Sequence, residues 1–154
     1  RTVWMAIDKD TRRPTDLTHV ADPEVVRTDL VCDMERPGKI RFPKEHNEAS
    51  CYRFGASDID FNRHVTSRRY VELIIDQLPL EVYDQCRMTR FEIAYSHESL
   101  CGERVRVMSG CDLATDALTS TIESEDGTQK CITRAWFVKR EDGSSVPAAK
   151  LLEY

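Results

Sequence analysis

Polar side chains suited to acyl-transfer chemistry recur at every second position of one short segment. The segment SDIDFNRHV carries Asp58, Asp60, Asn62 and His64. In an extended backbone, residues two apart point to the same face, so a carboxylate, an amide and an imidazole would converge there. A carboxylate can attack a carbonyl carbon or activate water, while amide and imidazole donors can stabilise an oxyanion. The spacing indicates a candidate site for nucleophilic or general-base catalysis.

A helix is predicted directly after this segment, between Thr66 and Leu78. Its apolar residues recur at helical spacing, at Tyr70, Val71, Ile74, Ile75 and Leu78. Thr66 or Ser67 can cap the N-terminus, and Pro79 stops the helix. The apolar face predicts core packing. The free N–H groups and the positive dipole end at the N-terminus favour negative charge that develops nearby.

The same residue types have two other common uses. Asp, Asn and Thr often make turn and cap hydrogen bonds at strand-to-helix junctions, and pattern alone favours this structural role over a catalytic one. The run Asp58-x-Asp60-x-Asn62 also resembles the start of a calcium loop. Such a loop needs Gly at its sixth position and Glu at its twelfth, where this chain has Arg63 and Arg69. Calcium binding is therefore disfavoured.

The remaining periodicity predicts an antiparallel sheet. Residues 49–57 suit a strand before the helix, and four strands are predicted after it, at 87–97, 103–113, 117–125 and 129–140. Turn signals lie at or near their ends, at Gly102, Asp126-Gly127 and Asp142-Gly143. One strand, one long helix and four strands joined by short links describe a sheet wrapped around a helix. The predicted class is α+β, with the hot-dog fold.

The first 48 residues lack this regularity. Residues 2–7 are β-branched and aromatic enough for a strand, which the turn residues of 8–14 would end. Residues 15–48 hold three prolines and predict a surface linker. Within the linker, Asp22 and Pro23 suit the start of a short helix that runs to about Leu30.

Composition limits the class of protein and its partners. A formal net charge of -5 disfavours nucleic acid as the main partner, because phosphate binding needs clustered basic residues. No apolar run approaches the roughly 18 residues of a membrane span. The six cysteines include no CxxC pair, which disfavours a structural metal. With no signal-type segment, they are expected to be reduced thiols of a cytoplasmic protein.

Two longer segments resemble a known family. DIDFNRHVTSRRYVELIIDQLP is similar to the catalytic segment of the plant and bacterial acyl-acyl carrier protein thioesterases, Asp-x-Asp-x-Asn-x-His-Val followed by a helix with a Tyr. The match falls at Asp58, Asp60, Asn62, His64, Val65 and Tyr70. FEIAYSHESLCGERV resembles that family's strand with a Tyr-x-x-Glu element, here Tyr95 and Glu98. The opening TVWMAIDKDTRRPTDL resembles the last strand and exit of the first of the family's two hot-dog domains.

The resemblance implies an activity and a role for each site residue. The activity is hydrolysis of a fatty acyl thioester on acyl carrier protein, in fatty acid biosynthesis, with no metal or organic cofactor. Asp60 is the first choice for nucleophile or base, Asn62 and His64 would orient the reacting groups and stabilise the oxyanion, and Glu98 would activate water. The division of roles between Asp60 and Glu98 stays open.

Three alternatives to this activity remain. They are an acyl-CoA thioesterase, a non-catalytic acyl-binding hot-dog module, and a hot-dog dehydratase that uses a His and a carboxylate across a dimer. The Asp-x-Asp-x-Asn-x-His string is of the thioesterase type, and the polar residues in register favour catalysis over binding.

The resemblance also implies a domain organisation. Residues 1–14 would end a preceding, mostly absent hot-dog domain, residues 15–48 would be the linker, and residues 49–154 the catalytic hot-dog domain. The chain would then be a fragment of a longer protein. Because a hot-dog sheet has long edges that attract pairing, a homodimer or pairing with a first hot-dog domain is expected.

Two departures from the family pattern bear on the site. Thr66 and Ser67 stand where the family commonly has two asparagines, and both are capping types, so the helix start should survive. Ser99 stands where plant members often have a cysteine. A cysteine nucleophile is therefore unsupported, and Cys101 is expected to be a small apolar filler.

Other conspicuous residues have structural expectations. His97 alternates with Glu98 along its strand and should face away from it, into solvent. Trp4 and Trp136 are expected to pack in the core or on the sheet. Arg63, Arg68 and Arg69 could meet an acidic carrier protein or a coenzyme phosphate, but a solvated helix face is favoured.

Overall fold

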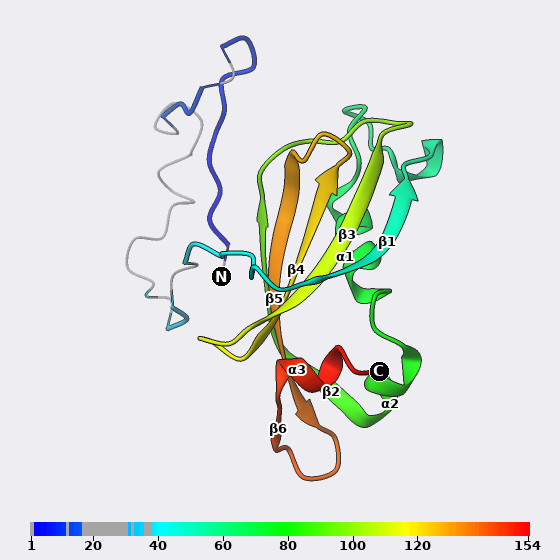
Figure 1. Ribbon diagram of the computed structural model, residues 1–154. Helices are drawn as coiled ribbons and strands as arrows, with labels where there is room; N and C mark the ends of the chain where they lie inside the picture. The colour runs from blue at the N-terminus through cyan, green and yellow to red at the C-terminus, as the bar shows by residue number, and fades with distance from the viewer. Residues whose placement is uncertain (1, 12, 17–30, 32, 36–37) are drawn as a thin grey trace. The chain divides into compact units, whose positions relative to one another are not determined.

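The computed structural model describes residues 2–11, 13–16, 31, 33–35 and 38–154 (Figure 1). The chain divides into two compact units, Arg1–Lys39 and Ile40–Tyr154. All the named helices and strands belong to the second unit. This unit begins at Ile40, earlier than the predicted domain boundary at residue 49.

The second unit is built on one curled antiparallel sheet, visible in Figure 1. Its strands are β1 (Asn47–Arg53), β2 (Cys86–Tyr95), β3 (Arg104–Asp112), β4 (Ala117–Ser124), β5 (Gln129–Lys139) and β6 (Ser145–Val146). The order is β1-β3-β4-β5-β2, and β6 pairs with the end of β5. The four predicted strands after the helix are confirmed to within about two residues at each end, the usual scatter of strand boundaries.

Turn and close-packing positions explain two of the glycines. Gly127 has a φ of +83° between β4 and β5, a conformation that a Cβ disfavours. At Gly110, a Cβ would lie 2.6 Å from the Pro43 ring and 2.8 Å from the Glu45 carbonyl. The segment before β1 therefore crosses β3 in direct backbone contact, which is why the compact unit includes it.

The long helix α1 (Ser67–Ile75) packs its apolar face against the sheet. Thr66 caps it as predicted, since its hydroxyl accepts the Arg68 N–H at 3.3 Å. Buried residues of α1 and of the facing strands form one core, which comprises Tyr70, Leu73, Ile74, Val105, Val107, Ile122 and Cys131 among others. This arrangement of a sheet around one helix confirms the α+β hot-dog fold.

The chain after α1 differs from the prediction. The helix ends at Ile75 rather than at Leu78, and a second helix, α2 (Leu80–Gln85), begins directly after Pro79. Proline suits a helix start as well as a helix end, and Val82 of α2 is fully buried. Together with β6 and the short helix α3 (Ala148–Leu151), α2 encloses a second core around Phe137 that was not predicted.

The first unit departs from the sequence prediction. Residues 2–7 form no strand, and the chain there has one isolated bridge, Ile7 with Pro14. A strand needs a pairing partner along its length, and among the described residues of this unit the backbone pairing of residues 2–7 is limited to this bridge and to the Thr15 N–H, which donates to the Ala6 carbonyl at 3.0 Å. Within its own unit, Trp4 is exposed rather than packed as predicted. The helix predicted from Asp22 to about Leu30 lies outside the described residues.

Trp136, by contrast, packs on the sheet as expected. The guanidinium groups of Arg90 and Arg134 lie 5.1 and 5.4 Å from the centre of its ring. Its indole N–H donates to the Thr115 carbonyl at 3.0 Å. In the described part of the chain, none of the helices has the length and apolarity needed to cross a membrane.

Candidate active site

The polar segment between β1 and α1 is a tight turn rather than an extended strand. The predicted strand over 49–57 stops at Arg53, and a single 3₁₀ turn, η1 (Ala56–Asp58), follows. The chain then turns again over residues 61–64, where Arg63 has a φ of +69°. The argument that alternate residues point to one face is therefore wrong here. Local hydrogen bonds of two aspartates hold the turn instead.

Asp58 is a structural residue of this turn. It is 5% exposed, and its Oδ2 accepts the Gly55 N–H at 2.7 Å and the Tyr52 hydroxyl at 3.1 Å. Its Oδ1 lies 3.2 Å from Nε of Arg69, whose guanidinium lies 4.5 Å from the centre of the Tyr52 ring. Arg69 is thus built into the turn, and its expected place on a solvated face is wrong. Arg63 and Arg68 are exposed as expected.

Asp60 organises the tip of the turn through its carboxylate. Oδ1 accepts the backbone N–H groups of Asn62, at 2.8 Å, and His64, at 3.1 Å. The Asp60 N–H in turn donates to the His64 carbonyl at 2.8 Å. Within the described residues these bonds leave Oδ2 without a hydrogen bond. The carboxylate is therefore held in one orientation just before the N-terminus of α1, and one of its oxygens remains available for chemistry.

His64 and Glu98 meet across the fold. Nε2 of His64 lies 3.3 Å from Oε2 of Glu98, and the two side chains are 33% and 49% exposed. A backbone hydrogen bond supports this contact, because the Val65 N–H donates to the Ser99 carbonyl at 2.9 Å. The loop between β2 and β3, residues 96–103, is called the Glu98 loop, and it is thus attached to the turn before α1 at two adjacent positions.

The four predicted residues are brought together to different degrees. His64 contacts Glu98 directly, and Asp60 is joined to His64 through the main chain. Asn62 bonds Asp60 through its backbone N–H, while its side chain is exposed and makes no hydrogen bond within the described residues. Its amide is therefore accessible to a bound molecule.

The hydroxyl groups of Ser99 and Tyr70 are buried at the Glu98 loop. Ser99 is fully buried and Tyr70 is 3% exposed, and neither oxygen has a hydrogen-bond partner of good geometry among the described residues. Burial raises the pKa of Tyr70, and the nearby Ser99 hydroxyl is the largest opposing influence. The Tyr95 hydroxyl donates to the Ser67 carbonyl at 3.3 Å, which ties β2 to the start of α1.

The comparisons with known proteins address this same region. The profile of the acyl-ACP thioesterase C-terminal domain matches residues 42–139, which include all four candidate residues. The chain belongs to the acyl-ACP thioesterase family. The resemblance found in the sequence motifs is thereby confirmed.

Three relatives show how much of the acyl-ACP thioesterase family's length this chain represents. Palmitoyl-acyl carrier protein thioesterase of Arabidopsis thaliana is 25% identical over 80% of this chain and 32% of its own length. Oleoyl-acyl carrier protein thioesterase of Coriandrum sativum is 24% identical, over 86% and 38%. The crystal structure of an acyl-ACP thioesterase from Bacteroides thetaiotaomicron superposes with a TM-score of 0.74 at 28% identity, over 85% of this chain and 52% of that one. The chain thus spans about a third of the curated relatives' length.

Cys101 and His97 lie next to the site in this acyl-ACP thioesterase domain, and only His97 has the exposure that the sequence predicted. Cys101 is exposed, so its expected role as an apolar filler is wrong; it lies in the turn that ends the Glu98 loop. His97 is exposed as expected, and its Nδ1 lies 2.9 Å from the Gln129 carbonyl.

One residue next to the site was not found from the sequence. Lys130 of β5 is 7% exposed, and its ammonium donates to the backbone carbonyl of Glu98 at 3.1 Å. In the sequence it is a lone Lys after a turn, where a solvated side chain is the ordinary expectation. Only its three-dimensional contacts distinguish it.

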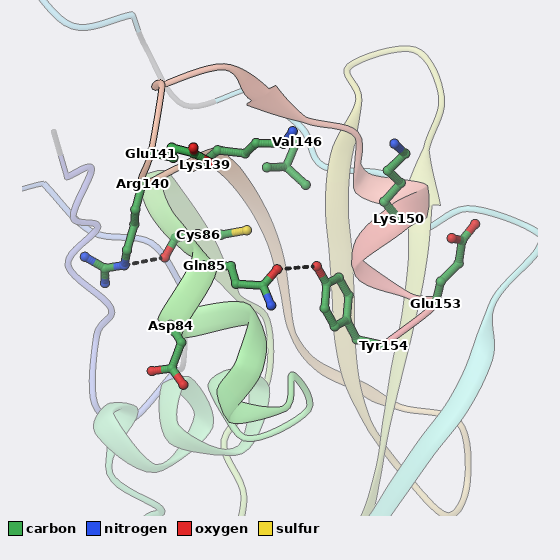
Figure 2. A pocket seen from close by; sticks show the side chains of 10 residues that line it. All are labelled: Asp84, Gln85, Cys86, Lys139, Arg140, Glu141, Val146, Lys150, Glu153 and Tyr154. Atoms are coloured by element: carbon green, nitrogen blue, oxygen red, sulfur yellow. Dashed lines mark hydrogen bonds between the residues drawn. The ribbon is translucent and has the colours of Figure 1, made fainter.

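A groove at the other end of the domain contains none of these residues (Figure 2). It lies between the end of α2, the end of β5 and the C-terminal segment. There, Gln85 accepts a hydrogen bond from the Tyr154 hydroxyl at 3.0 Å, and Arg140 donates to the Cys86 carbonyl at 3.0 Å. Because β5 rises about 3.3 Å per residue, its two ends are roughly 30 Å apart. The groove is remote from Glu98.

Proposed function

We propose that this chain carries the catalytic residues of a hydrolase that releases fatty acids from acyl carrier protein. The observation that carries the proposal is the contact of His64 with Glu98 beside the ordered carboxylate of Asp60, at the N-terminus of α1. Membership of the acyl-ACP thioesterase family supports the reaction class. A place in fatty acid biosynthesis and in the cytoplasm belongs to the same proposal.

Asp60 and Glu98 divide the chemistry between them. In the first route, Oδ2 of Asp60 attacks the thioester carbonyl carbon, the C–S bond breaks and the carrier thiolate leaves. Glu98 then takes a proton from a water that attacks the acyl carbon, which frees the fatty acid and restores the Asp60 carboxylate. In the second route, Asp60 takes the proton from water, that water attacks the thioester directly, and Glu98 acts by holding His64. The protonated carboxylate, Glu98 in the first route and Asp60 in the second, then gives its proton to the thiolate, so both routes end with the carrier thiol and the free acid.

The remaining groups stabilise the charge on the carbonyl oxygen. The exposed side-chain amide of Asn62 can donate to it, and His64, whose Nε2 faces Glu98, can donate through Nδ1 when its ring carries both protons. The free N–H groups at the start of α1 present positive partial charge to the same region. Donors fixed in advance of the reaction are worth about 10² to 10³-fold each in rate in comparable acyl-transfer sites.

Release of thiol from palmitoyl- and oleoyl-acyl carrier protein, followed with a colorimetric thiol reagent, tests the proposal. The matching coenzyme A thioesters form the parallel arm. Faster turnover of the carrier protein substrates is expected. Faster turnover of the coenzyme A thioesters would assign the chain to acyl-CoA hydrolysis, and binding without thiol release would make it an acyl-binding module.

Intact-mass measurement of Glu98→Gln after mixing with substrate separates the two routes. If Asp60 is the nucleophile, this variant forms the acyl-enzyme but hydrolyses it slowly, so the protein gains the mass of the acyl group. Asp60→Asn is the matched control and should gain no mass. An unmodified Glu98→Gln that remains slow would support direct attack by water.

A further inference from the structure

Lys130 occupies a β-bulge at the start of β5. Ile122 of β4 pairs with Cys131 and Glu123 pairs with Gln129, so Lys130 is the extra residue on its strand. A bulge redirects a side chain that regular pleating would place elsewhere, and bulges are over-represented next to active sites. Lys130 is 7% exposed as a whole residue, and a lysine is rarely buried to this extent unless it is paired.

Three hydrogen bonds tie Lys130 to the segment that leads into Glu98. Its backbone carbonyl accepts the N–H groups of Ser96, at 2.8 Å, and His97, at 3.3 Å. Its ammonium donates to the Glu98 carbonyl at 3.1 Å. Lys130 thus holds three consecutive residues of the loop: its main chain binds Ser96 and His97, and its side chain binds Glu98.

Glu103 completes the attachment at the far end of the same loop. One of its carboxylate oxygens lies 2.5 Å from the Lys130 ammonium, and the other accepts the Leu100 N–H at 3.1 Å. Its backbone carbonyl accepts the Phe54 N–H at 3.0 Å, which fastens the loop to the end of β1. The ion pair therefore links both halves of the loop that presents Glu98.

We infer that Lys130, together with Glu103, is a positioning residue that sets the place of the Glu98 carboxylate against His64. This inference rests on the proposed function, since Glu98 is a catalytic group only there. A buried ion pair is seldom more stable than an apolar pair of similar size, so stability alone does not account for it. The Glu98 side chain is 49% exposed, so it needs a rigid support to keep its position against His64. Misplacement by about 1 Å can cost on the order of 10²-fold in rate.

The test is a cycle of variants assayed for thiol release from palmitoyl-acyl carrier protein. Lys130→Met keeps the length of the side chain and removes the ammonium. It should lower kcat by at least about 10-fold with little change in KM, because geometry and not substrate binding is altered. In a Glu98→Gln background, the same change should have almost no further effect. Equal losses in both backgrounds, or an unchanged kcat in Lys130→Met, would overturn the inference.

Two further variants separate positioning from folding. Lys130→Met with Glu103→Gln removes both charges, so no uncompensated charge is left buried if the single variant unfolds; it should fold and keep the loss in kcat. The matched control is Arg134→Met, on the same strand. Arg134 is 15% exposed and pairs with Glu92 at 2.6 Å, whereas the Lys130 side chain is 9% exposed. Arg134→Met should leave kcat unchanged, and a similar loss there would contradict the inference.

Amide hydrogen exchange gives a readout that needs no activity. The Leu100 and Val65 N–H groups should exchange faster in Lys130→Met than in Arg134→Met at equal global stability. Unchanged exchange would show that Lys130 does not hold the loop and would overturn the inference. A wild type that is inactive even in the version extended upstream, with faster exchange in Lys130→Met, would instead refute the proposed function and support the loop attachment by itself.

Discussion

At the scale of single residues, Asp58 and Asp60 lie in one turn but make different contacts. Asp58 is buried, hydrogen-bonded to Tyr52 and Gly55 and paired with Arg69, while Asp60 is partly exposed and, among the described residues, its carboxylate accepts hydrogen bonds only at Oδ1. Their residue type is the same, and their surroundings differ. A pair of matched substitutions can therefore separate structure from catalysis within three positions of the chain.

Asp60→Asn should lower kcat by at least about 10²-fold, the scale of lost acid–base or nucleophilic help. The amide oxygen can still accept the Asn62 and His64 N–H groups, so the thermal midpoint should change little. The control, Asp58→Asn, should cost roughly 2 kcal/mol of stability, the scale of a hydrogen bond to a charged group, with less effect on kcat. Steady-state kinetics and thermal unfolding on both variants check this, and near-full activity in Asp60→Asn would remove its assigned role.

Cys101→Ser should retain activity, because the proposed nucleophile is an oxygen of Asp60. Cys101 is exposed at the end of the Glu98 loop, so the replacement disturbs no core. The thiol-release assay with a thermal midpoint on the same sample is sufficient. Complete loss of activity in a folded variant would reverse the mechanism in favour of the thiol.

At the scale of elements, turn residues fix how the strands meet. Asp126 accepts the Ser124 hydroxyl at 2.7 Å and the Thr128 N–H at 2.9 Å at the turn from β4 to β5. These bonds lower its pKa from 3.8 to about 2. This turn leads directly into the bulge that holds Lys130, so its order bears on the site.

Because the folded-state pKa of Asp126 is depressed, the folded state binds fewer protons than the unfolded state between the two values. The carboxylate therefore contributes stability above about pH 3.8. That contribution is lost as the pH falls toward about 2. Asp126→Asn should be less stable than the wild type near neutral pH and equal to it near pH 2. Thermal midpoints across this range measure the difference, and a gap that persists at the acidic end would contradict the assignment.

At the scale of the whole molecule, the sheet has two open edges within the described residues. Strand β1 pairs only with β3, and β2 pairs only with β5. Such edges attract pairing with another chain or domain unless they are covered. Because relatives of this family are about three times as long as the matched region, a first hot-dog domain is a natural candidate for the cover.

We expect that the isolated chain does not work as a monomer of 17.8 kDa. Either two copies pair and imitate a double hot-dog, or the chain associates loosely and loses most of its activity with an incomplete acyl pocket. Light scattering and the thiol-release assay on one sample distinguish the two. A version extended upstream is the control. Full activity at the monomer mass would contradict the predicted domain organisation.

Local sequence patterns were sufficient to predict much of the fold and the family of this protein. The β-branched and alternating stretches of residues 87–140 and their Asp-Gly turn predicted the four strands after the helix to within about two residues at each end, and Thr66 predicted the start of α1. These features depend on neighbours in the chain, as periodicity and capping do. The Asp-x-Asp-x-Asn-x-His string likewise identified the family, because its residues lie close together in the sequence.

The tertiary structure decided everything that depends on partners distant in sequence. Residues 2–7 have strand composition but form no strand, since pairing and not composition makes one. Asp58 and Asp60 look alike in the sequence, and only burial beside Tyr52 and Arg69 separates them. The bulge that turns Lys130 toward the Glu98 loop follows from the register of β5 against β4, and His64 meets Glu98 because the turn before α1 packs against the loop after β2. Register is set by the packing of the whole sheet, and no local spacing in the chain contains it.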